Sequence, residues 1–368
     1  MISQNLKGVV CDILSLCISS QRRNLSIKPI HMKKHKRIVI EANGSTDVLN
    51  TVEEALPDPK PGEVRVRVLA AGVGFADVMA QHGGYPLAPK LPFTPGYDFT
   101  GIVDQIGEGV TDVAEGQSVA ALNPQFGCYA EYICVRSELL VNVPEELDPA
   151  EVVSIILNYL TAHCILHKKG HLSEKESVLI HAAAGGVGTA LLQLGNLLDL
   201  KMYGTASKRK HDIICQFGGI PIDYRNQDFL EFIRKEMPDG VDAAFDPIGG
   251  ANLRRSYQTV RKNGRIISYG FAGKKFGGLG RMVFGVLLMS LLNILPDGKR
   301  VRLCATPGEV KKDKPWYRET LAELLSMLSD RKIQPVIGAR IPLVEVQHAH
   351  RLMEEGSVCG KVVLLNEA

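Results

Sequence analysis

The chain has 368 residues, which is more than one typical hydrophobic core accommodates and predicts two domains. Apolar residues make up 45% and charged residues 23%, so the composition excludes fibrous and disordered classes. A formal net charge of +3 gives no reason to expect nucleic acid as a partner. None of the eight cysteines forms a CxxC pair or a Cys/His cluster with zinc-ligand spacing, so we expect free thiols, no metal and a cytoplasmic location.

Residues 1–31 form an N-terminal extension that we expect to be poorly ordered. The segment carries several cations and serines, with Asp12 as its single acid, and weakly resembles an organellar transit peptide. A mitochondrial location therefore stays open beside the cytoplasmic one. The folded part begins near the strand-like run Lys36–Ile40.

The first half is rich in predicted strands. Val64–Val68 alternates apolar and charged residues, as a half-buried strand does, and follows the turn residues Pro61 and Gly62. Glycine-punctuated strands follow at Thr100–Ile106, Gln117–Ala121 and Tyr129–Val135. The pattern predicts a small barrel-like domain.

From about residue 151 to 300, helical patterns alternate with short apolar strands. This alternation indicates βαβ units and a parallel sheet with helices on both faces. The predicted strands are Ser177–His181, Lys201–Thr205, Pro221–Asp223, Val241–Asp246 and Arg265–Tyr269. After about 303 we expect a helix at Tyr317–Ser329, a strand at Ile337–Ile341, another helix and a final strand at Lys361–Leu365.

Met282–Leu295 is the most apolar stretch of the chain. It falls short of the roughly 20 residues that a membrane-spanning helix needs, so we predict no transmembrane segment here. A buried or interface helix is the favoured interpretation, and a helix that touches a membrane or covers the substrate is the alternative.

The strongest motif is a strand that runs into a glycine turn and then a helix, over Ser177–Gly188. Gly185 and Gly186 permit a sharp turn whose backbone N–H groups approach a pyrophosphate, with Val187 in the same turn. Gly188 allows the helix to pack closely against the strand, and the helix N-terminus faces the phosphates. The context on both sides predicts a dinucleotide site rather than a structural turn.

Cofactor choice depends on the end of the next strand. NAD sites place an acid there for the ribose 2′-hydroxyl, whereas this chain has Gly204–Lys210 without an acid. The hydroxyl of Ser207 and the cations from Lys208 onward suit a 2′-phosphate, so we predict NADPH. Tyr224 and Arg225, after the third strand, could flank the same phosphate.

Four ordered motifs resemble the medium-chain dehydrogenase/reductase superfamily, and within it the zinc-independent quinone oxidoreductase branch. The motifs cover all of the chain except the extension, and the segment Gly277–Asp297 is similar to the vesicle amine transport protein group. They are Pro95–Gly101, Gly127–Tyr132, His181–Gly188 and Gly360–Val363.

The resemblance implies an α/β fold, with a GroES-like β-barrel domain and a Rossmann doubly wound parallel sheet. The GroES-like catalytic domain would comprise 32–157 and 303–368, and the Rossmann NADPH-binding domain 158–302. A homodimer, formed through the Rossmann sheet, is also implied.

The resemblance also implies which residues contact the cofactor, and it shows departures. Thr161, Gly186, Val187, Lys208 and Tyr224 would contact the cofactor, and Gly249 and Phe271 would lie toward the nicotinamide. Zinc-dependent members carry ligands where this chain has Gly74, Tyr97-Asp98 and a residue near Asn158, so no catalytic zinc is expected.

The substrate side departs from many quinone reductases, which carry Asn, Tyr and Arg where this chain has Gly74, Met79 and Gln81. The pocket candidates that remain are Phe75, Tyr85, Asn158 and Phe271, and no catalytic residue is assigned. We interpret Asp77 as a turn or cap residue rather than a catalytic one.

Two functions follow as hypotheses. The first is an NADPH-dependent oxidoreductase that reduces quinones or α,β-unsaturated carbonyls, which are small-molecule substrates, by metal-free hydride transfer. The alternative is an NADPH-binding protein with weak or no catalysis that associates peripherally with membranes or partners. RNA binding has little support, because the cations cluster only at Lys208–Lys210 and no aromatic-rich motif accompanies them.

Overall fold

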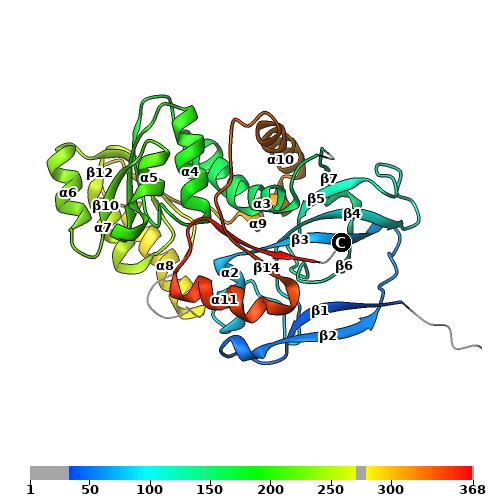
Figure 1. Ribbon diagram of the computed structural model, residues 1–368. Helices are drawn as coiled ribbons and strands as arrows, with labels where there is room; N and C mark the ends of the chain where they lie inside the picture. The colour runs from blue at the N-terminus through cyan, green and yellow to red at the C-terminus, as the bar shows by residue number, and fades with distance from the viewer. Residues whose placement is uncertain (1–32, 145, 271–278, 367–368) are drawn as a thin grey trace, which may run out of the picture. The chain divides into compact units, whose positions relative to one another are not determined.

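The computed structural model describes residues 33–144, 146–270 and 279–366, and the folded unit begins at Lys34 (Figure 1). The extension 1–31 and Phe271 lie outside the described residues. Two sheets organise this unit, one mostly antiparallel and one parallel, beside a separate hairpin of β1 (Lys34–Ile40) and β2 (Leu49–Ala55).

The antiparallel part is a seven-stranded sheet in the order β14-β15-β3-β4-β5-β7, with β6 paired to β3. The long strand β3 buries Val64, Val66 and Val68 on one face, which is the alternation that the sequence predicts. The C-terminal strand β15 pairs antiparallel with β3, so the end of the chain completes the N-terminal domain. The bounds are β3 Glu63–Val73, β4 Asp98–Ile106, β5 Ser118–Leu122, β6 Tyr132–Arg136, β7 Val141–Asn142, β14 Ile337–Pro342 and β15 Lys361–Leu365.

The second sheet has six parallel strands in the order β10-β9-β8-β11-β12-β13. Its bounds are β8 Ser177–Ile180, β9 Lys201–Ala206, β10 Ile220–Asp223, β11 Val241–Asp246, β12 Val260–Ser268 and β13 Arg300–Leu303. The strand order reverses direction at β8, as a doubly wound sheet requires. The sequence did not predict the edge strand β13, because its alternation of Arg with Val and Leu covers only four residues.

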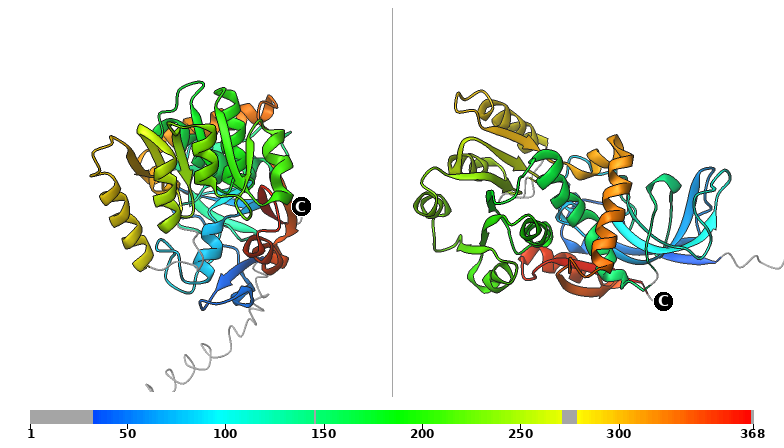
Figure 2. Two further views of the ribbon diagram at one scale, coloured as in Figure 1. Left: turned by 90° about the vertical axis from the view of Figure 1, so that its left-hand side faces the viewer. Right: turned by 90° about the horizontal axis from the view of Figure 1, so that it is seen from above.

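Helices connect these strands and surround the parallel sheet (Figure 2). They are α4 Gly186–Leu197, α5 His211–Gln216, α6 Phe229–Glu236, α7 Gly250–Thr259 and α8 Leu279–Leu292. The other part of the chain carries α2 Phe75–Gln81, α9 Thr306–Lys312, α10 Lys314–Ser329 and α11 Val346–Glu355.

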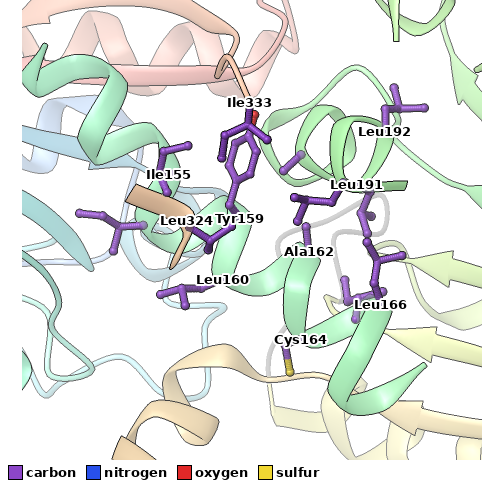
Figure 3. Packing of buried hydrophobic residues seen from close by; sticks show 14 of the residues in the cluster. Ile155, Tyr159, Leu160, Ala162, Cys164, Leu166, Leu191, Leu192, Leu324 and Ile333 are labelled. Atoms are coloured by element: carbon purple, nitrogen blue, oxygen red, sulfur yellow. The ribbon is translucent and has the colours of Figure 1, made fainter. Parts of the chain in front are cut away.

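Helix α3 (Pro149–His163) lies in the core between the two sheets. Asp148 caps its N-terminus by accepting a hydrogen bond from Ala150 N at 3.0 Å, and a π-helical turn extends it to Lys169. Its apolar side chains, including Tyr159 and Leu160, pack against α4 and α10 (Figure 3). Both parts of the fold therefore share this helix, and the predicted boundary after residue 157 falls inside it.

The stretch Pro149–Lys169 is also the one described helix that is long and apolar enough to cross a membrane. Because 78% of its most apolar window is buried, its hydropathy has an explanation in core packing. Helix α8 differs, since it leaves several large apolar side chains in solvent.

Candidate functional site

The glycine turn after β8 has the geometry of a dinucleotide cradle. Ala182 adopts a left-handed φ of 53°, and Gly185 N donates to Ala182 O at 2.9 Å, which closes the turn before α4 begins at Gly186. A Cβ on Gly188 would lie 2.3 Å from Ala182 O, so only glycine fits where the helix meets the strand end. The N-terminus of α4 is thereby directed at the carboxyl edge of the sheet, where it would receive a pyrophosphate.

A cavity of about 860 Å³ opens at this edge, next to the turn. Of the predicted cofactor residues, Gly185, Ser207 and Tyr224 line it. Lys208 does not line it, whereas its neighbours Arg209 and Lys210 do. The other predicted residues lie outside this lining: Gly186, Val187 and Gly188 begin α4, Thr161 is on α3, and Gly249 precedes α7.

Four cations and two acids line the cavity, which favours an anionic ligand. Arg255 is neutralised by Asp228 at 2.6 Å and lies over the ring of Phe229, 4.4 Å from its centre. Arg225 lies 6.0 Å from the ring of Tyr224. No sequence pattern indicates Arg255, because it comes from α7, three strands further along the chain than the glycine turn.

Two of the cations hold the C-terminal segment against this site. Arg209 donates to Gly356 O at 2.9 Å, and Lys210 Nζ donates to Val358 O. Burial lowers the pKa of Lys210 from its ordinary value. Gly360 N also donates to Ala184 O at 2.9 Å, so the chain's end is joined directly to the glycine turn.

Asn158, on helix α3, lies against the glycine turn. A Cβ on Gly186 would lie 2.4 Å from Asn158 Nδ2, so the carboxamide rests against the turn. One helical turn further along α3, Thr161 Oγ1 bonds Thr306 Oγ1 at 2.7 Å. Both predicted residues are buried and have fixed positions at the junction of the two sheets.

The positions that hold zinc ligands in related enzymes do meet in space here. Asp98 accepts a hydrogen bond from Leu157 N at 3.2 Å, and a Cβ on Gly74 would contact the Leu157 side chain at 3.4 Å. The charge that faces Asp98 is the buried ammonium of Lys361, at 2.9 Å. Burial raises the pKa of Asp98, and the contact with Lys361 opposes that shift. Among the described residues no group of three or more His, Cys, Asp or Glu side chains could hold a metal ion.

The aromatic rings of Tyr85, Tyr97 and Phe126 pack against one another, and Tyr97 directly precedes Asp98 in the sequence. The hydroxyl of Tyr97 donates to that of Tyr85 at 3.2 Å, and the Tyr97 and Phe126 ring centres are 4.0 Å apart. Burial raises the pKa of both tyrosines, so the pair stays protonated. The sequence motifs point to Tyr85 as a pocket residue but not to its partner Tyr97, whose position they mark only as lacking a zinc ligand.

Asp77 caps α2, as expected, and has a second contact that the sequence did not indicate. It accepts hydrogen bonds from Gly74 N at 2.8 Å and from Gly96 N at 2.9 Å, which joins the two backbone segments beside the aromatic rings. Because its carboxyl group is fully buried, its pKa is raised to about 6.

Met79 and Gln81, which differ from the residues of many quinone reductases, have structural roles. Met79 is buried, and Gln81 donates to Gly44 O and to Glu354, both at 3.2 Å. Its carbonyl oxygen accepts from His350 Nδ1 at 2.6 Å. Gln81 therefore joins α2 to α11 and is not available to a substrate. Phe75 begins α2 and is partly buried.

An antiparallel sheet completed by the C-terminus, joined to a doubly wound parallel sheet with a glycine turn, defines the class of GroES-like and Rossmann reductases and dehydrogenases. Comparisons with known proteins agree. Residues 60–145 match the alcohol dehydrogenase GroES-like domain, and residues 219–364 match a zinc-binding dehydrogenase family.

Relatives fall into two named groups. The chain is 34% identical to a synaptic vesicle membrane protein VAT-1 homolog of Danio rerio, over 90% of this chain and 70% of that protein. It is 28% identical to a quinone oxidoreductase of Sus scrofa, over 84% of this chain and 91% of that protein. The Escherichia coli quinone oxidoreductase complexed with NADPH has a similar structure, with a TM-score of 0.81, 25% identity, and coverage of 90% of this chain and 99% of that one.

The chain belongs to the medium-chain dehydrogenase/reductase superfamily, in the group that contains VAT-1 homologues and quinone oxidoreductases. This confirms the resemblance and the fold class predicted from the sequence motifs. Because its relatives include quinone oxidoreductases, the family is one of oxidoreductases.

Proposed function

We propose that this protein is an NADPH-dependent oxidoreductase that reduces quinones or α,β-unsaturated carbonyls without a metal. The observation that carries the proposal is the juxtaposition of a cation-lined cavity at the glycine turn with a substrate side where Lys361 faces Asp98. NADPH binding is supported by the cradle at Gly188 and by the related structure that holds NADPH.

The bound cofactor would supply the hydride, and the chain's own groups would orient the acceptor. Asn158 lies against the turn, and its carboxamide and the Tyr85 hydroxyl are the groups that we propose to hydrogen-bond the carbonyl oxygen of the acceptor. A phenol that keeps its proton can donate to the oxygen on which negative charge develops.

The 2′-phosphate would be recognised by cations that have no carbonyl partner. In the described part of the chain, the Arg225 side chain makes no hydrogen bond and has the Tyr224 ring and the charge of Asp223 as neighbours, and the Lys208 side chain makes no hydrogen bond or ion pair. Arg225 and Lys208 can therefore turn toward a phosphate, whereas Arg209 and Lys210 are already bonded. Thr161, Val187, Gly249 and Ser207 complete the proposed cofactor contacts.

The test is oxidation of NADPH and NADH with a panel of simple quinones and alkenals, with and without a metal chelator. We expect faster turnover with NADPH than with NADH, and the same rate with and without the chelator. The double variant Lys208→Glu/Arg225→Glu should raise the KM for NADPH by about tenfold or more, near 1.4 kcal/mol, and leave the KM for NADH unchanged. No turnover with any acceptor, or equal losses with both nucleotides, would contradict the proposal.

A second function, peripheral membrane association, is favoured by the exposed apolar surface of α8. Phe284, Leu287 and Leu291 are 60%, 57% and 63% exposed, and Ile294 just beyond the helix is 77% exposed. The surrounding sequence 272–296 carries three cations and no acid, which suits an anionic lipid surface. α8 lies at the edge of the parallel-sheet part (Figure 2).

This second function is tested by cosedimentation with vesicles that contain phosphatidylserine. Leu287→Glu/Leu291→Glu should abolish binding, and Val344→Glu, at another exposed apolar residue, should not. Leu288 is unsuitable for this purpose because it packs against the core. If the double variant instead converts a dimer to a monomer in light scattering, a second copy covers α8, as the predicted homodimer would.

A further inference from the structure

Four buried polar side chains next to the cofactor cavity, those of Thr205, His181, Ser256 and Asp246, are joined in that order by hydrogen bonds. We call this series the hydrogen-bond chain. Thr205 Oγ1 lies 3.0 Å from His181 Nδ1, and His181 Nε2 lies 3.0 Å from Ser256 Oγ. Ser256 Oγ lies 2.8 Å from Asp246 Oδ2. Each side chain is at most 3% exposed, and they come from β9, the end of β8, α7 and the end of β11.

The direction of every hydrogen bond in this chain follows from Asp246. Its two carboxyl oxygens also accept from Ile248 N at 2.7 Å, Gly249 N at 2.9 Å and Asn252 Nδ2 at 2.9 Å. With donors on both oxygens, Asp246 acts as an acceptor. The Ser256 hydroxyl has two acceptors for its one proton, Asp246 Oδ2 at 2.8 Å and Asn252 O at 2.9 Å, and neither of them can donate to it.

The same logic fixes the tautomer of His181. Because Ser256 gives its proton to Asp246 or to Asn252 O, in both cases it can only accept from His181, so Nε2 carries the ring proton. Nδ1 is then an acceptor, and the Thr205 hydroxyl donates to it. Burial lowers the pKa of His181, which keeps the ring neutral as this arrangement requires.

The two ends of the hydrogen-bond chain, Thr205 and Asp246, lie on opposite sides of the cofactor cavity. At one end, Thr205 and Ser207 line the side of β9, where the sequence places 2′-phosphate recognition. At the other end, Asp246 fixes the turn that contains Ile248 and Gly249. In a doubly wound sheet the adenosine half crosses the second strand, so the nicotinamide half crosses the β11 side.

We propose that His181 and Ser256 are positioning residues that set the turn at Ile248 and Gly249, on the nicotinamide side of the proposed site, relative to the adenosine-side wall. The inference rests on the proposed binding of NADPH. If these groups merely satisfied one another in the core, their loss would weaken both halves of the site equally.

The test compares NADPH with adenosine 2′,5′-bisphosphate, which carries only the adenosine half. For Ser256→Ala we expect the Kd for NADPH to rise about fivefold to tenfold, while the Kd for the bisphosphate stays within about twofold. The matched control is Thr259→Val on the same helix, which removes a buried hydroxyl that donates to Ser256 O and lies outside the chain. Equal weakening of both ligands, or no change in either, overturns the proposal.

Two further measurements do not depend on one variant folding. In the wild-type protein labelled with ¹⁵N-histidine, His181 should give the shifts of a neutral ring protonated at Nε2, and an Nδ1-protonated or charged ring overturns the assignment. Thr205→Val and Ser256→Ala should be non-additive for NADPH affinity although they connect only through His181, and strict additivity counts against the coupling. If the wild-type protein binds neither the bisphosphate nor NADPH, the proposed function itself is contradicted. This outcome differs from failure of the present inference, in which the wild-type protein binds both ligands.

Discussion

The hydroxyl of Tyr97 donates to the hydroxyl of Tyr85 at 3.2 Å, which leaves the proton of Tyr85 free to face a ligand. Removing the first hydroxyl in Tyr97→Phe should therefore lower kcat for quinone or enone reduction about fivefold to tenfold, the effect of about 1 kcal/mol of lost hydrogen bonding. The Kd for NADPH should not change, because the pair lies outside the cofactor cavity and belongs to the proposed substrate side.

Tyr85→Phe should have the same effect, and the double variant should add little, since the two hydroxyls act as one unit. Tyr132→Phe on β6, where the ring packs against His35, is the matched control. Steady-state rates for Tyr97→Phe that equal those of the wild type would show that the pair does not contact the acceptor.

Asp77 predicts a pH dependence of stability on the acidic side. Its pKa is about 6 in the folded protein against an ordinary value of 3.8, so the unfolded state ionises first as pH rises. The stabilising contribution of the protonated carboxyl is complete below about pH 4 and is lost by about pH 6, for a total of about 3 kcal/mol. Urea unfolding across this range should show the decline.

The control for this prediction is Asp77→Asn, which cannot ionise. The variant loses one acceptor for the two backbone donors Gly74 N and Gly96 N, so it should be less stable at low pH. The difference between wild type and variant should shrink as pH rises from about 4 to about 6. A difference that is constant with pH would mean that Asp77 keeps an ordinary pKa.

Gly188 tests the cradle directly. An added Cβ at 2.3 Å from Ala182 O forces the helix away from the strand end, so Gly188→Ala should abolish measurable NADPH binding and destabilise the protein. Gly308→Ala, on α9, adds a methyl group where no atom lies within 4 Å and should behave as wild type. Calorimetric titration and thermal unfolding of both variants make the comparison, and normal binding by Gly188→Ala would refute the assigned geometry.

The glycine turn, the barrel-like sheet and most strands could be predicted because their signals are local in sequence. The run before Gly185 is apolar, and the alternation of Val64–Val68 is visible within five residues. The contacts that complete the site are long-range, and no local pattern encodes them. The bond from Arg209 to Gly356 and the pairing of His181 with Ser256 each join segments that only the fold brings together.

The positions that align with zinc ligands show both what the sequence can predict and what it cannot. Motif comparison identified Gly74, Tyr97-Asp98 and the region of Asn158 as lacking metal ligands, and the fold does bring those segments together. It could not show that Lys361, from the last strand, faces Asp98, because a buried ion pair has no sequence signature. The motif Gly360–Val363 supports the family resemblance but does not by itself indicate a role for Lys361.

The ion pair between Lys361 and Asp98 predicts a strong dependence of folding on both partners. The two side chains are 2% and 0% exposed, so Lys361→Met leaves an unpaired buried carboxylate and should cost about 3–5 kcal/mol of unfolding free energy. Adding Asp98→Asn removes that charge and should restore most of the loss, which denaturant unfolding of the single and double variants measures. If Lys361→Met were within about 1 kcal/mol of wild type, the ammonium would not be the group that neutralises Asp98.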